Sequence, residues 1–117
     1  MFNKNNNSSE LVISEDVIIK IASVAAAEIN GVAGVVTNSN LKGMLKISKK
    51  GVNVAFGDNE TVIDVFIKLK AGIKITDIAE QVQQNVKEAV QDMTGRPVTR
   101  VNVHVADIEL ENGGTGK

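Results

Sequence analysis

Residues 51–69, GVNVAFGDNETVIDVFIKL, decide the fold of this 117-residue chain. Apolar side chains alternate with other residues on both sides of a central polar segment: Val52, Val54 and Phe56 before it, Ile63, Val65, Ile67 and Leu69 after it. The segment itself is Gly57-Asp58-Asn59-Glu60, whose residue types favour a tight turn. Alternation with a period of two around a turn predicts a β-hairpin with one face towards the core.

A helix is predicted on each side of this hairpin. Ser14 is placed to cap the first helix, whose apolar arc continues to Asn30-Gly31, where a left-handed C-cap is expected. Thr76 is placed to cap the second helix, whose apolar stripe runs from Ile78 to Met93 and stops at Gly95. Both helices therefore have one clearly apolar side, which must be buried against another layer.

Short strands are predicted near both ends of the chain. Residues 11–13 are apolar and suit a first strand, and residues 98–110 suit a last one. In the last strand the alternation set by Val101 changes parity before Ile108, which predicts a bulge or the end of the strand near Ala106. The order of elements predicts an α+β domain: two helices packed on one face of a small mixed or antiparallel sheet, with a central β-hairpin.

Composition limits the chain to one ordinary domain, which we place at residues 10–111, with residues 1–9 and 112–117 expected to be disordered tails. The chain has 13 Lys+Arg, 14 Asp+Glu and no Cys, so it offers no thiolate chemistry and no overall field for nucleic acid. Lys20 and Glu28 interrupt the most apolar stretch, and residues 1–9 lack the apolar core of a secretory signal. We therefore expect neither a membrane span nor export.

Candidate catalytic residues are scarce. His104 is the only His, and its strand parity places it with Arg100 and Asn102 on the polar side of the last strand. The sequence places no nucleophile or recognised metal-ligand spacing beside it, so we interpret it as an exposed strand residue. The expectation is a protein that is not an enzyme, with no catalytic, metal or cofactor residues.

Two features suggest binding. Gly31-Val32-Ala33-Gly34 has the G-x-x-G spacing of KH domains, although its central residues are apolar and a C-cap explains Gly31. The one basic cluster consists of Lys42, Lys46, Lys49 and Lys50. Such a cluster suits phosphates or anionic headgroups, but the simpler interpretation is a solvated linker.

In order and spacing, the chain resembles the alkaline-shock, or general-stress, envelope proteins of Gram-positive bacteria. The resemblance lies in these segments: Val12-Ile13-Ser14, Val17-Ile18-x-x-Ile21-Ala22, Ile29-Asn30-Gly31-Val32-x-Gly34-Val35, Lys50-Gly51-Val52-x-Val54, Val62-Ile63-Asp64-Val65, Ile78-Ala79-x-x-Val82-Gln83-x-x-Val86, Met93-Thr94-Gly95 and Val101-Asn102-Val103-x-Val105. It implies a non-enzymatic cytoplasmic protein that self-associates and reaches the inner face of the cell membrane through a membrane-anchored protein partner. It supplies no site residues.

The leading hypothesis is an adaptor or scaffold in the cell-envelope stress response, with contacts made by sheet edges or by the outer face of the first helix. That helix is more apolar than burial against one layer requires, and Ile19 is the residue we place at its outer contact, alongside the four lysines. Two alternatives remain open. One is a KH-like nucleic-acid-binding module, although nucleic acid is the less favoured partner, and the other is a regulatory accessory subunit of a metabolic enzyme.

Overall fold

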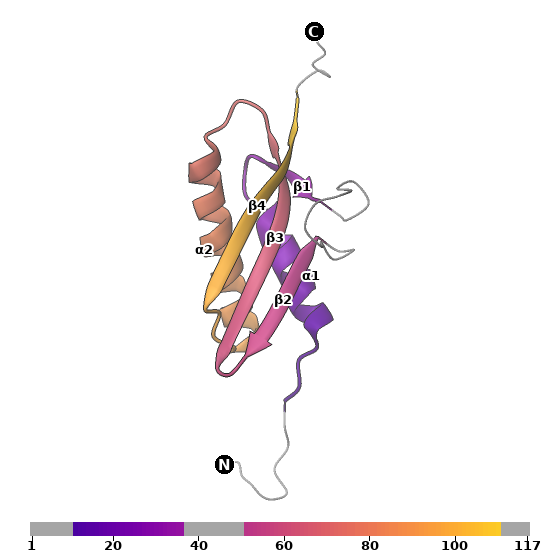
Figure 1. The fold of residues 1–117 in the computed structure, drawn as a ribbon, viewed down its shortest axis with the longest axis vertical. Helices are drawn as coiled ribbons and strands as arrows, with labels where there is room; N and C mark the ends of the chain where they lie inside the picture. Colours follow the sequence, from indigo (N-terminus) through magenta and orange to yellow (C-terminus); the bar gives the residue numbers. More distant parts are fainter. Residues whose placement is uncertain (1–10, 37–50, 111–117) are drawn as a thin grey trace, which may run out of the picture.

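The computed structural model describes residues 11–36 and 51–110 (Figure 1). In chain order the elements are α1 (Glu15–Ala27), β1 (Val32–Val35), β2 (Val52–Gly57), β3 (Glu60–Lys70), α2 (Ile75–Thr94) and β4 (Arg100–Glu109). Both helices lie behind the sheet in Figure 1, with α2 against β4 and α1 against β1 and β2. The α+β architecture, with two helices on one face of a small sheet, is therefore confirmed.

Strand β3 is the centre of the sheet. It pairs antiparallel with β1 and β2 and parallel with β4, so the sheet is mixed. Strands β1 and β2 follow one another along the same edge of β3 and meet at Phe66, whose carbonyl accepts from Val36 N at 2.7 Å and whose N–H donates to the Gly51 carbonyl at 3.0 Å. The long strand β3 thus joins every other strand of the described sheet.

The predicted hairpin is present as β2 and β3. Its two strands pair from Val52 with Val65 to Gly57 with Glu60, and Asn59 takes a positive φ of 54° in the turn. The alternating residues of β3 expected in the core, Ile63, Val65, Ile67 and Leu69, are all fully buried. The hairpin therefore presents its apolar face to the helices, as its periodicity predicted.

Of the bulge and the strand end predicted near Ala106, the structure has the bulge. Val105 pairs with Ile67, but the next partner of β3, Lys68, pairs with Asp107. Ala106 is therefore the extra residue, and it shifts the parity of the strand at the predicted place.

The helix limits match the predictions in part. Ser14 caps α1, and its side chain accepts from Val17 N, but the helix ends at Ala27, before Gly31, whose φ of 104° instead serves the turn into β1. Helix α2 starts at Ile75 after Lys74, so the predicted cap at Thr76 is wrong, while Gly95 does form the left-handed C-cap.

Two strand assignments near the start of the chain differ from the predictions. Residues 11–13 form no strand, although they are apolar. Residues 32–35, for which no strand is predicted, form β1 because their backbone pairs with the far end of β3. The pairing partner therefore decides which of these short apolar runs becomes a strand.

Candidate functional site

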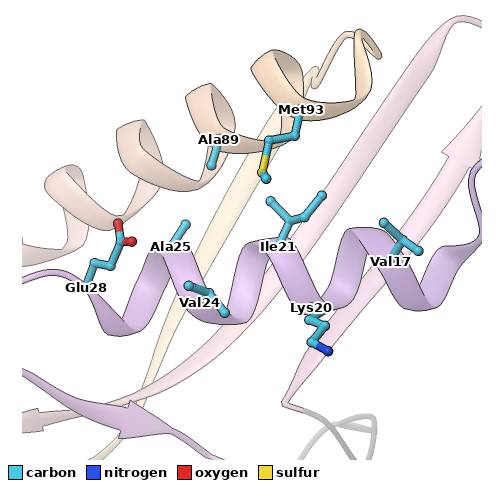
Figure 2. A pocket seen from close by; sticks show the side chains of 8 residues that line it. All are labelled: Val17, Lys20, Ile21, Val24, Ala25, Glu28, Ala89 and Met93. Carbon is cyan, nitrogen blue, oxygen red and sulfur yellow. The ribbon is translucent and has the colours of Figure 1, made fainter.

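A solvent-open groove of about 370 Å³ lies between α1 and α2 (Figure 2). It is lined by Val17, Lys20, Ile21, Val24, Ala25, Glu28, Ala89 and Met93. Three of its apolar side chains are well exposed: Val17 at 47%, Val24 at 55% and Met93 at 71%. Scattered exposed apolar residues are normal on protein surfaces, but these three converge on one concavity.

The groove exists because two neighbouring helices share one sheet. The sheet covers the inner side of α1, where Ile18, Ala22 and Ala26 are fully buried. The apolar arc of α1 is wider than the side facing the sheet, so its outer part faces α2 and solvent. Asn85 on α2 fixes the two helices together, donating from Nδ2 to the Ala25 carbonyl at 2.7 Å and to Glu28 Oε1 at 3.2 Å.

Small side chains keep the floor of the groove open. Ala25 and Ala89 come from facing helices, and Figure 2 shows Met93 extending from α2 towards Ile21 on α1. Lys20 and Glu28 are the charged residues of the lining. An apolar floor with charges only at its margins suits the side chains of another protein surface, because the apolar area is buried while the charges orient the partner.

Ile19 on α1 is the residue that the sequence predicts at an outer contact. Ile19 is only 8% exposed and belongs to the main core, so its assignment to the outer face is wrong. Met93 is also corrected, since it was expected in the buried stripe of α2 and is exposed instead. Helical periodicity identifies which residues share an arc, but it does not show which part of the arc a neighbouring helix leaves uncovered.

The binding features found in the sequence are the lysine cluster and the G-x-x-G segment. Lys42, Lys46, Lys49 and Lys50 lie outside the described residues. The G-x-x-G segment runs from the turn at Gly31 into strand β1, and Val32 is buried. A KH loop connects two helices and faces nucleic acid, whereas this segment leads from α1 into a strand, which agrees with the structural interpretation of its glycines.

His104 lies on the opposite face of the sheet. Its Nε2 is 3.0 Å from Asp64 Oδ1, its ring stacks on Phe66 with 4.3 Å between centroids, and Asn102 Nδ2 donates to the same carboxylate oxygen at 3.0 Å. The predicted polar parity is confirmed, but the side chain is only 35% exposed. The parallel register, which places Asp64 opposite Asn102 and Phe66 opposite His104, creates this cluster, and the sequence alone did not indicate it.

The cluster has the character of a structural network. Asp64 accepts from both polar neighbours, so its main effect is to satisfy polar groups that are partly buried. Within residues 11–36 and 51–110, no group of three or more His, Cys, Asp or Glu residues is arranged to hold a metal ion. No helix among the described residues has both the length and the apolar composition needed to cross a membrane.

Comparison with known proteins identifies relatives along almost the whole chain. The model of the alkaline-shock protein 23 family, described as having a cell envelope-related function, matches residues 3–110. Two proteins of Bacillus subtilis (strain 168) are similar: YqhY is 29% identical over 115 residues, covering 95% of this chain and 85% of the relative, and YloU is 31% identical over 109 residues, covering 88% and 91%. Spy1535 of Streptococcus pyogenes serotype M6 is 32% identical over 104 residues, covering 87% and 81%.

Solved structures share the fold. Two variants of MamM CTD, one of them a nickel form, align with a TM-score of 0.52. They are 17% and 16% identical in sequence, and the alignments cover 80% of this chain and 95% and 99% of those chains. At this level of identity the likeness concerns the arrangement of helices and strands only.

Proposed function

Because this chain belongs to the alkaline-shock protein 23 family, whose function is cell envelope-related, we propose that it is a non-enzymatic adaptor or scaffold that works through contacts with other proteins. The observation that carries the proposal is the apolar groove between α1 and α2. Val24 and Met93 expose more than half of their surface there, beside charges that orient a partner.

The proposal includes recruitment. In it, the protein is cytoplasmic and peripheral, held at the inner face of the cell membrane by a membrane-anchored protein partner during envelope stress, and it self-associates. The family membership supports the link to the envelope, and the groove supports binding by protein contact. The domain that performs this role is residues 10–111.

The test is affinity purification of a tagged full-length chain from gently solubilised native membranes, with mass spectrometry of the captured proteins. We expect one small membrane protein to be enriched over the soluble fraction. A Val24→Asp variant should lose it, because a charge in the groove opposes apolar contact. Thr76→Asp is the matched control, since it adds the same charge at an exposed position in the first turn of α2, where an acidic residue is tolerated.

The other outcomes have clear meanings. If a soluble metabolic enzyme is captured instead, the chain is a regulatory accessory subunit and the scaffold proposal is wrong. If nucleic acid co-purifies, strong absorbance at 260 nm reveals it, because the chain has no Trp or Tyr and absorbs little at 280 nm. If Val24→Asp captures the membrane protein as well as Thr76→Asp does, the groove is not the contact surface.

A further inference from the structure

We propose that the groove between α1 and α2 binds a second copy of this chain, with the two α1 helices antiparallel about a twofold axis at Val24. The inference names the surface and geometry of the self-association in the proposed function and rests on it. It commits the groove to a second copy, so the membrane protein binds the pair and the Val24→Asp variant loses it by losing the pair. The argument for this occupant is charge complementarity along α1.

Three residues on the outer face of α1 carry the geometry. Lys20, Val24 and Glu28 are spaced four residues apart, so each charge lies about 6 Å along the helix from Val24, on opposite sides of it. All three line the groove, and Val24 is 55% exposed between the two charges. The face is therefore apolar at its centre, positive towards one end and negative towards the other.

This pattern is complementary to itself in one orientation only. When two copies meet antiparallel at Val24, Lys20 of each copy comes level with Glu28 of the other, giving two opposite-charge pairs. When two copies meet in parallel, Lys20 faces Lys20 and Glu28 faces Glu28. The charges thus favour the antiparallel pair and oppose the parallel one.

The surroundings of the two charges allow this contact. Lys20 is exposed. Glu28 already accepts one hydrogen bond, from Asn85 Nδ2 at 3.2 Å, which orients its carboxylate at the rim of the groove. A carboxylate accepts several hydrogen bonds, so a lysine from a second copy finds a free acceptor site.

Apolar contact supplies the rest of the interface. Met93 stands over Ile21 at the side of the groove, as Figure 2 shows, and Val17 extends the apolar strip by two turns beyond Val24. Methionine is flexible enough to adjust to a neighbouring surface. In the pair, the exposed side chains of each copy cover the floor of the other groove.

Charge reversal tests the orientation by sedimentation equilibrium. Each single variant, Lys20→Glu or Glu28→Lys, converts both opposite-charge pairs into like-charge pairs, so we expect the dimer to weaken at least about tenfold. The double variant Lys20→Glu/Glu28→Lys should return to near wild-type dimerisation. An equimolar mixture of the two single variants should form a heterodimer, because all its facing charges are opposite.

Disulfide trapping tests the axis. The chain has no Cys, so a Val24→Cys variant carries one thiol, which lies next to its copy at the twofold axis. Mild oxidation should give a covalent dimer. The control is Lys87→Cys on the exposed side of α2 away from the groove, where we expect little cross-linking.

The outcomes separate this inference from the proposed function. A chain that stays monomeric at high concentration overturns the pairing, as does a dimer that resists both single charge reversals. Efficient cross-linking at Lys87→Cys but not at Val24→Cys places the contact elsewhere and also overturns it. In each case, capture of a membrane protein that the Val24→Asp variant loses would still support the adaptor function, with the membrane protein itself in the groove.

Discussion

Replacing Gly51 by alanine should disrupt the junction between β1 and β2. Gly51 precedes β2, has a φ of 78°, and accepts from Phe66 N through its carbonyl at 3.0 Å. A Cβ built on it would overlap the Val35 side chain and lie 2.5 Å from the Val36 carbonyl oxygen. Moving that oxygen away is costly, because the N–H of Val36 is itself hydrogen-bonded to β3.

Two costs combine at this position. A left-handed backbone costs a residue with a Cβ about 1–2 kcal/mol. Forcing a methyl group against fixed backbone adds about 1–3 kcal/mol, typical of overpacking. We therefore expect Gly51→Ala to lower the free energy of unfolding by about 2–5 kcal/mol, a large part of the stability of a domain this size.

Gly72→Ala provides the matched control. Gly72 also has a positive φ, 86°, but a Cβ there meets nothing within 4 Å. This variant carries the backbone cost alone, so we expect a loss of about 1–2 kcal/mol. Gly34→Ala, with open space and no positive φ, should be nearly neutral.

Urea unfolding followed by far-ultraviolet circular dichroism is the assay, because the chain lacks Trp and Tyr for fluorescence. The three variants should show ordered losses at unchanged m, with Gly51→Ala the largest. If Gly51→Ala is no less stable than Gly72→Ala, the clash at the junction is not real and the reasoning about β1 and β2 fails.

Three further predictions concern the core, the cap and the sheet cluster. Ile19→Ala should lower the free energy of unfolding by about 2–4 kcal/mol, and Val24→Ala by less than about 0.5 kcal/mol, because only Ile19 is buried. Equal losses in urea titrations would contradict the placement of Val24 in an open groove. Ser14→Ala should cost about 1 kcal/mol through loss of the α1 cap, measured by thermal melting, and Ser14→Asp should retain most of it. Asp64→Ala should lower the free energy of unfolding by about 1 kcal/mol and increase rotation of the His104 ring in NMR spectra. The loss is small because the His104 and Asp64 side chains are 35% and 30% exposed, so solvent weakens their hydrogen bond. An unchanged ring signal would count against that hydrogen bond.

Local sequence patterns predicted the elements that depend on neighbours in the chain. The hairpin follows from alternation around Gly57-Asp58-Asn59-Glu60, and the bulge at Ala106 follows from a change of parity within one strand. The cap at Ser14 and the C-cap at Gly95 are likewise decided by side chains and backbone within one turn. In each case the physical cause lies within a few residues.

Features that depend on distant partners were missed or misplaced. Residues 32–35 became a strand and residues 11–13 did not, because only the former reach a free edge of β3. Asp64 and His104 meet through a parallel register that neither strand encodes alone. The sequence alone determined the apolar arc of α1. Only the packing of α2 beside it decided that Ile19 is core and that Val24 faces the groove, because burial depends on which surface lies opposite.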